Sequence, residues 1–515
     1  MHKLFISSLV ALWITGCSGG SDNFSSPKEA DAQACIEPQG ESIDLQTSPG
    51  TLSDFADLIY GAGKYLLIAE RTDTSPDSSY QLVSIDTEAQ SRSVLSENIR
   101  TSTRQYSTGS TTPASANIAA PLYEGRGDNA GQYFFHKYVP ENSTLPRHWK
   151  SELWVTDGSH CGTQRVLGEE DLRVHFSNHP NLDEERVNFS YLGSNKNKVY
   201  VAAEVFGCGQ TEEGDPGIGC TAIVEWNRNT AAVRKTGYLR GAEIIFAQEN
   251  EIALHQTGGQ IYRASFTDNN AAALTDIPDG VTLLLTENGF AYYLVQGVQL
   301  VNVRRRPQIN RVNLRDGSIT SLGLPDPDAD YIKAVPDFGP LARPHGIVVA
   351  ILPGNVRRIW RIDAEEATLV EVSENGEAVR EAAKTDTARY WIKRSGQPTR
   401  QEFYTPDSVF PLAAFEGIES IDPTSIDGER YVGTALHSQF GSEPHILNPF
   451  EGTVELLADV VVGEESSDPL DFVRIGNFLF FNSQGNFNGN YYVCDGRYCP
   501  QTHALYILRL DEYLD

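Results

Sequence analysis

The chain has 515 residues, 40% of them hydrophobic, and a formal net charge of -28. A surface this acidic repels nucleic acid and anionic lipid headgroups, so both classes of partner are excluded. The length permits several domains or one large repeat array, and the 44 glycines and 26 prolines favour a turn-rich fold.

The first residues, MHKLFISSLVALWITGCSGG, have the pattern of an export signal. The apolar run from Leu4 to Ile14 is too short to span a bilayer and fits the core of a signal peptide. Its end, ITGC, resembles the bacterial lipobox. The resemblance implies that residues 1–16 are a lipoprotein signal peptide, and that Cys17 becomes the first residue and carries acyl chains such as palmitate.

The residues after Cys17 indicate a destination. Ser18 follows where Asp could stand, which resembles the sorting pattern of outer-membrane lipoproteins. We therefore expect a lipid anchor in the outer membrane, with the protein on its periplasmic or its cell-surface side. The polar residues that follow predict a lipidated flexible tether over residues 17–40 and a folded domain over residues 41–515.

The cysteine count supports export. The chain has seven cysteines, and an even number remains once Cys17 is set aside, which favours disulfides in an exported protein. Proximity in the sequence is the basis for the pairing, since many other pairings of the same cysteines are possible. It predicts the bonds Cys208–Cys220, Cys494–Cys499 and, by subtraction, Cys35–Cys161.

Short apolar runs separated by Gly, Asp, Asn and Pro recur along the folded part, which is typical of an all-β protein. Nine hairpin-like segments share a skeleton of apolar residues, an Asp or Asn, a turn and an exit strand. The best preserved is LWVTDGSHCGTQRVL, and the nine segments in chain order are 82–95, 153–167, 223–235, 261–274, 309–322, 359–372, 403–415, 446–457 and 507–514.

The repeat predicts a single large β-propeller of four-stranded antiparallel blades. One or two further apolar runs precede many of the hairpins, and the middle units recur roughly every 40 to 50 residues, as propeller blades do. Propellers usually have four to eight blades, so we expect seven to nine here, about eight, with the seventh or eighth unit spurious. The last unit lacks an exit strand, and residues 41–48 could supply it, which would join both ends of the chain in one blade.

A known family shares the best-preserved segment. ELWVTDGSHCGTQRV resembles the ELWxTDGTxxGTxxV repeat of bacterial exported β-propeller proteins, with Ser159 where the repeat usually has Thr. The resemblance covers this one segment closely and implies the fold. It carries over no catalytic residues. Asp157-Gly158 reads as a hairpin turn, because Gly accepts a positive φ, so the segment predicts structure and not an active-site loop.

Patterns of known chemistry are sparse. The serine-hydrolase pattern G-x-S-x-G occurs only as GCSGG, inside the lipobox-like segment, and is attributed to chance. No zinc-protease HExxH, phosphate-binding loop or dinucleotide fingerprint occurs. Asp326, Asp328 and Asp330 have the spacing of a Ca²⁺ loop, but Tyr331 stands where that loop needs Gly, so a solvated turn is favoured. The sequence predicts no cofactor and no catalytic residue.

The sequence favours a binding or scaffolding module at the cell envelope, a monomer with a protein or glycan partner. Insertions over residues 100–117 and 207–220 are the first candidates for the contact surface. Two alternatives stay open. One is a carbohydrate-active enzyme, a glycoside hydrolase or lyase, that uses carboxylates in the propeller funnel. The other is an envelope-assembly factor.

Overall fold

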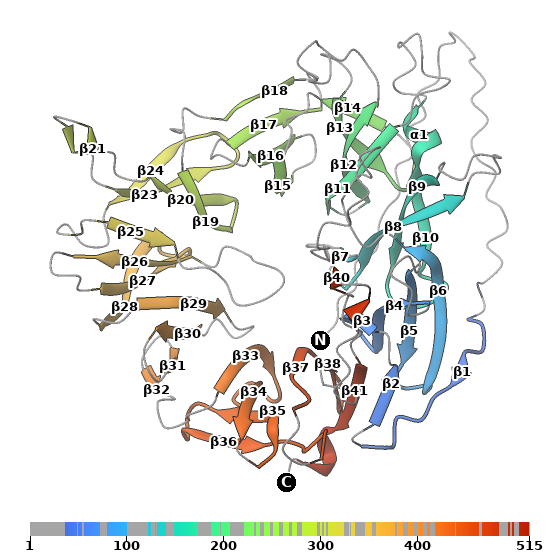
Figure 1. Ribbon diagram of the computed structural model, residues 1–515. Helices are drawn as coiled ribbons and strands as arrows, with labels where there is room; N and C mark the ends of the chain where they lie inside the picture. Colours follow the sequence, from blue (N-terminus) through green and yellow to red (C-terminus); the bar gives the residue numbers. More distant parts are fainter. Residues whose placement is uncertain are drawn as a thin grey trace, which may run out of the picture. The chain divides into compact units, whose positions relative to one another are not determined.

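A computed structural model of the chain describes residues between 35 and 513 (Figure 1). Outside the description lie residues 1–34, 514–515 and several internal stretches, the longer of which are 73–79, 100–121, 141–148, 174–186, 206–220, 237–241, 275–280, 324–328, 335–345, 385–389, 412–417 and 484–492. Residues 38–515 form one compact unit, and residues 1–37 form another. The predicted signal peptide and Cys17 lie outside the described residues.

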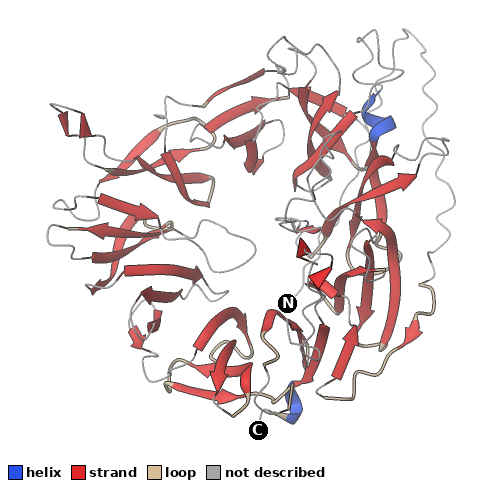
Figure 2. Cartoon of the chain, viewed as in Figure 1, coloured by secondary structure: helices blue, strands red, loops and turns tan. Residues whose placement is uncertain are grey.

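The described chain consists almost entirely of antiparallel strands (Figure 2). The first sheet has nine strands and contains two four-stranded runs, joined by the single residue pair Ile99 and Lys137. One run is β3 (Ala56–Ala62), β4 (Tyr65–Arg71), β5 (Tyr80–Asp86) and β6 (Ser91–Ile99), with β1 (Glu41–Ser42) added beside β6. The other is β7 (Leu122–Glu124), β8 (Tyr133–Pro140), β9 (Trp149–Thr156) and β10 (Gln164–Gly168).

Four four-stranded sheets follow in chain order, each built from strands that are consecutive neighbours apart from one small inserted hairpin. The first is β11 (Val187–Asn195), β12 (Lys198–Val205), β13 (Thr221–Asn227) and β14 (Val233–Thr236). The second is β15 (Ala242–Ala247), β16 (Glu251–Gln256), β17 (Ile261–Ser265) and β18 (Asn270–Ala273). The third is β19 (Val281–Glu287), β20 (Phe290–Val295), β23 (Gln308–Asn313) and β24 (Ile319–Gly323), interrupted by the pair β21 (Gln299–Leu300) and β22 (Val303–Arg304). The fourth is β25 (Tyr331–Ala334), β26 (Ile347–Ile351), β27 (Arg357–Asp363) and β28 (Thr368–Asn375).

Three more four-stranded sheets complete the described chain. They are β29 (Ala378–Lys384), β30 (Tyr390–Ser395), β31 (Arg400–Tyr404) and β32 (Val409–Pro411); then β33 (Ile418–Ser425), β34 (Tyr431–His437), β35 (Gly441–Asn448) and β36 (Thr453–Leu456); and then β37 (Pro469–Ile475), β38 (Phe478–Ser483), β41 (Ala504–Arg509) and β2 (Gly50–Ser53). A small pair, β39 (Val493–Cys494) and β40 (Arg497–Tyr498), lies in the chain between β38 and β41. The helices within the described residues include α1 (Glu169–Arg173) and a 3-10 turn over Leu510–Glu512, and no described helix has the length and apolarity to cross a membrane.

The chain is an all-β propeller of four-stranded antiparallel sheets, as the repeat predicted. The first two hairpin segments form the third and fourth strands of the two runs in the nine-stranded sheet. Each of the next six forms the third and fourth strands of a sheet of its own, and the ninth overlaps the end of β41. The seventh and eighth segments form β31–β32 and β35–β36 within complete sheets, so the expectation that one of them was spurious is wrong. That expectation took weak similarity to the repeat as evidence against a blade. Strand pairing depends on the apolar skeleton and on a turn more than on a particular turn sequence, so a weakly similar segment can still form strands.

A recurring side-chain contact explains the Asp or Asn at the turn of these hairpins. The Oδ1 atoms of Asp86 and Asp363 each accept hydrogen bonds from the backbone N–H groups two and three residues ahead, at 2.9–3.1 Å. Asn227 and Asn448 make the same pair of bonds. A short polar side chain that bonds to its own backbone two residues on favours a turn, so the repeated residue has a structural role.

The N-terminal segment closes the last sheet, but with residues other than those expected. β2 pairs with β41, matching Gly50 with Ile507 and Ser53 with Leu505. Of the expected stretch 41–48, only Glu41 and Ser42 form a strand, and they pair with β6. Asp44 ends that strand, because its Oδ1 and Oδ2 atoms accept bonds from the Gln46 N–H and the Thr47 hydroxyl and so favour a turn.

The core lies between successive sheets. One cluster joins β8 and β9 to β11, β12 and β13, and includes Phe134, Leu153 and Val201. Another joins the last sheet to the first: Phe480, Leu505 and Ile507 pack with buried residues of β3 and β4. Apolar side chains on both faces of a strand are expected where both faces of a sheet are covered, and burial of each such residue contributes about 1.5–3 kcal/mol.

Candidate functional site

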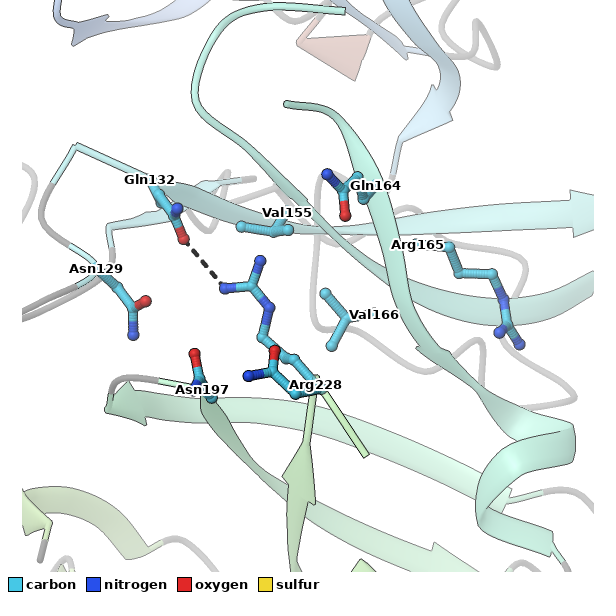
Figure 3. Close-up of a pocket in the computed structure, with 9 residues that line it drawn as sticks. Asn129, Gln132, Val155, Gln164, Arg165, Val166, Asn197 and Arg228 are labelled. Atoms are coloured by element: carbon cyan, nitrogen blue, oxygen red, sulfur yellow. Dashed lines mark hydrogen bonds between the residues drawn. The ribbon is translucent and has the colours of Figure 1, made fainter. Parts of the chain in front are cut away.

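A cavity of about 640 Å³ opens beside the ends of the strands of two neighbouring sheets, β7–β10 and β11–β14 (Figure 3). We call it the amide pocket. Most of its lining residues carry a polar side chain, and five of them are Asn or Gln; the lining comprises Asn129, Gln132, Val155, Gln164, Arg165, Val166, Asn197, Arg228 and Asn229. Its volume is in the range of small-molecule sites in proteins.

Strand register explains why these residues meet. Asn129 and Gln132 precede β8, whose first residue, Tyr133, pairs with Thr156 at the end of β9. Gln164 at the start of β10 pairs with Val155, so this part of the lining comes from one end of its sheet. Asn197 lies in the β11–β12 turn and Arg228 directly follows β13. Those positions are at one end of the next sheet, because Lys198 pairs with Asn227.

Asn129 is the most informative residue of the pocket. It is only 4% exposed, and among the described residues its Nδ2 group has no hydrogen-bond partner. Its backbone carbonyl accepts a bond from Gln132 N–H at 3.0 Å, which fixes the turn that carries both amides. A buried donor without a partner costs about 1–3 kcal/mol, so native proteins seldom keep one unless a ligand or water completes it.

Arg228 lies at the centre of the lining (Figure 3). Its Nη1 donates to Gln132 Oε1 at 3.1 Å, and its backbone N–H donates to Asn197 O at 2.8 Å, which ties the two turns of its sheet together. The guanidinium lies 6.0 Å from the centroid of the Phe134 ring. Burial lowers the pKa of the Arg228 guanidinium, and Tyr191 opposes that effect. Among the described residues, no carboxylate forms an ion pair with it.

Arg165 lines the same cavity but its charge is balanced. Its guanidinium forms ion pairs with Glu152, Glu170 and Asp171, the first at 2.9 Å and the last at 2.7 Å. Figure 3 shows this guanidinium on the other side of β10 from Gln164 and Val166, as the alternation of side chains along a strand requires. The cation available within the pocket is therefore Arg228.

A second polar site involves Glu443 on β35, which is fully buried. Its carboxylate accepts bonds from Ser467 N–H at 3.0 Å, Ser467 Oγ at 2.7 Å and Val460 N–H at 3.1 Å. Burial raises the pKa of this carboxyl to about 7, although these bonds oppose the rise. Its hydrogen bonds join β35 to the segment before β37, so we interpret Glu443 as part of the packing between two sheets.

The predicted site residues have separate outcomes. Cys35 and Cys161 are each disulfide-bonded, while their predicted partnership stays a prediction. Cys494 ends β39 opposite Arg497 of β40. The remaining predicted residues lie outside the description: Cys17, Cys208, Cys220, Cys499, Asp326, Asp328 and Asp330. Within the described ranges, no group of three or more His, Cys, Asp or Glu side chains could hold a metal ion.

The amide pocket was not predicted from the sequence. Part of its lining lies in two amide-rich segments, Asn195-Lys196-Asn197 and Asn227-Arg228-Asn229. Each turn alone is ordinary, because Asn is common in turns. The two insertions expected to form the contact surface, residues 100–117 and 207–220, lie outside the described residues, so their role stays a prediction.

The comparisons with known proteins indicate a fold without an activity. No protein-family model matches the chain, and the search of characterised proteins finds no match. Among solved structures, the β-propeller domain of the Trilobed protease from Pyrococcus furiosus is 11% identical, with a TM-score of 0.35, covering 79% of this chain and 98% of that one. An acylaminoacyl peptidase from Pyrococcus horikoshii is 9% identical, with a TM-score of 0.36, covering 83% of this chain and 57% of that one.

An oligogalacturonate lyase in complex with manganese is also similar, at 12% identity and a TM-score of 0.29, covering 75% of this chain and 98% of that one. Identities this low relate to the fold alone. The propeller is established here by the pairing of its own strands, and the chemistry must be argued from the pocket.

Proposed function

We propose that the protein is a binding module of the cell envelope, whose propeller holds a polar, hydroxyl-rich ligand of the glycan class in the amide pocket. The observation that carries the proposal is Asn129, a buried amide in the lining whose Nδ2 group has no hydrogen-bond partner in the part of the chain that the structure describes. A ligand hydroxyl would accept that hydrogen bond and remove the cost of leaving it unmade.

The composition of the lining supports this class of ligand. Each amide offers both donors and an acceptor, which matches the dual character of sugar hydroxyls. The nine lining residues include no Asp, Glu, His or Cys. The described lining therefore supports recognition of a polar ligand.

The binding test uses soluble protein without residues 1–17 on a glycan array, with Asn129→Ala as the decisive variant. We expect the variant to lose about tenfold or more in affinity for any glycan that the wild type binds, because one buried hydrogen bond is lost. Its melting temperature should stay equal or rise, since Asn129 Nδ2 has no bond to lose on folding.

The exposed residue Gln46, outside the lining, supplies the matched control as Gln46→Ala. Equal binding by wild type and Asn129→Ala would contradict the assignment of the pocket. Failure of the wild type to bind any glycan would contradict the ligand class.

We further propose that Cys17 carries the lipid that anchors this module to the outer membrane. The support is the lipobox-like ITGC and the short apolar run before it. Expression of the full chain in a Gram-negative host with a labelled fatty acid should label the protein, and Cys17→Ser should abolish the label. Labelling of the Cys17→Ser variant would contradict the proposal, and Cys35→Ser serves as the cysteine control.

We also propose that the propeller has nine blades. The support is the pairing of strands: seven separate four-stranded sheets and two four-stranded runs within the nine-stranded sheet. The number is at the upper end of the expected range, because every hairpin of the repeat belongs to a sheet of its own or to one of these runs.

A further inference from the structure

The charge of Arg228 sets the amide pocket apart from its surroundings. Two other described arginines of these sheets have carboxylate partners: Arg165 pairs with Glu152, and Arg234 pairs with Glu225. Arg228 has a neutral partner, Gln132 Oε1, and an aromatic ring nearby. A partly buried guanidinium without a counter-ion is unfavourable, and the lowered pKa of Arg228 reflects this burial.

The hydrogen-bonding capacity of Arg228 also exceeds what the protein uses. A guanidinium carries five N–H donors in a planar fork that matches a carboxylate with two parallel bonds. The described residues provide one side-chain acceptor, Gln132 Oε1, which is bonded to Nη1. Arg228, Asn129 and Asn197 line the same cavity, and Figure 3 shows the guanidinium near its centre.

We infer that the ligand of the amide pocket is an acidic sugar, whose single carboxylate is held by Arg228 and whose hydroxyls are held by the surrounding amides. The inference rests on the proposed function and specifies its ligand. Within the described lining, one cation without a carboxylate partner matches one carboxylate, whereas a phosphate ester carries about two negative charges and would leave one unbalanced. Arg165 does not supply a second charge, because it is bound to three carboxylates.

The overall charge of the protein makes this local arrangement necessary. With a net charge of -28, the protein as a whole repels anions, so an acidic ligand needs a specific contact to be retained. Short-range bonds from one guanidinium, in a place shielded from water, are stronger than the same bonds on an exposed surface. Arg228 thus provides specificity for the acid over the neutral sugar.

The test compares acidic glycans on the array with the same glycans after chemical reduction of their carboxyl groups to alcohols. We expect the wild type to bind the acidic forms about tenfold to a hundredfold more tightly, because a charge-assisted bond pair is lost on reduction. Arg228→Gln should bind both forms with equal affinity. Arg228→Lys keeps the charge but not the fork and should retain part of the preference.

The control is Arg315→Gln, which alters an exposed arginine outside the lining and should leave the ratio between acidic and reduced forms unchanged. Equal wild-type binding of acidic and reduced glycans, or a preference that survives in Arg228→Gln, would overturn the inference while leaving glycan binding in place. A preference for phosphorylated glycans would overturn it as well. Absence of any glycan binding would overturn the inference and the proposed function together.

Discussion

At the scale of single residues, Gly158 shows how one turn serves two sheets. It has φ = +96°, in the region that favours glycine, at the turn after β9. A Cβ atom at this position would lie 2.4 Å from the Cβ atom of Tyr65, at the start of β4. Ser84 Oγ on β5 also donates to Gly158 O at 2.6 Å. The β9–β10 hairpin is therefore held against β4 and β5 by backbone that cannot carry a side chain.

Gly158→Ala should destabilise the protein by about 2–4 kcal/mol, since it combines a strained φ with a clash. Gly63→Ala is the matched control, because Gly63 also has a positive φ, +60°, but open space around its Cβ position. The control should cost about 1–2 kcal/mol, which is the strain alone. Chemical denaturation of both variants measures the difference, and equal losses would show that the contact with Tyr65 is not rigid.

At the scale of elements, closure of the last sheet by β2 is the pairing with the longest separation in the sequence. β2 covers one side of β41, whose other side pairs with β38. The segment before β2 contributes Leu45, which is fully buried beside Leu505 and Ile507 in the cluster between the last and first sheets. Without this segment, β41 would present unpaired backbone groups at an exposed edge.

A soluble chain that begins at residue 54 should melt on the order of 5–10 °C below one that begins at residue 44. The longer chain lacks β1 but keeps Leu45 and β2, so the comparison isolates closure of the last sheet from the small contribution of Glu41 and Ser42. Thermal unfolding followed by circular dichroism measures the difference. Equal melting temperatures would mean that β2 contributes no stability.

The hairpins were predictable because their signal is local. An apolar strand, an Asx residue and a turn lie within about 15 residues of one another, so each hairpin can be read from its own segment. A strand from the N-terminal segment was predictable as the partner of β41, because the last unit lacked a strand. The residues that form this strand were not predictable. Residues 41–48 and 50–53 both contain short polar and apolar alternations, and only the second stretch forms backbone pairs with Ile507 and Leu505.

The amide pocket was not predictable for the opposite reason. Asn129 and Arg228 are almost 100 positions apart in the sequence, and they share a cavity because two separate sheets end at the same place. Asn, Gln and Arg are also common in exposed turns, so their identity alone indicates nothing. What marks the site is burial without partners, and burial is a property of the folded chain.

At the scale of the whole molecule, Glu443 couples folding stability to pH. Burial raises the pKa of this carboxyl from its ordinary value of 4.5 to about 7. The folded state thus binds the proton more tightly than the unfolded state does. The stability that this proton provides is complete below about pH 4.5 and is lost as the pH rises through about 7.

We therefore expect Glu443 to lower the melting temperature of the wild type by several degrees as the pH rises from about 4.5 to 7. The Glu443→Gln variant should lack this decrease. Glu429→Gln, at an exposed position, serves as the control and should keep the pH dependence of the wild type. Differential scanning calorimetry across this range provides the measurement. An identical pH profile in wild type and Glu443→Gln would refute the linkage.

The pairing of β2 with β41 has a consequence for the connectivity of the chain. In the last sheet, β2 is the strand synthesised first, and it pairs with β41, which is synthesised last. The order of the sheets is therefore circular, and the connections between successive sheets are topologically equivalent. A circularly permuted gene could join residue 513 to residue 50 by a short linker and open the chain between two other sheets. Such a permutant would separate the predicted tether from the closing strand, so that the proposed attachment and folding could be varied one at a time.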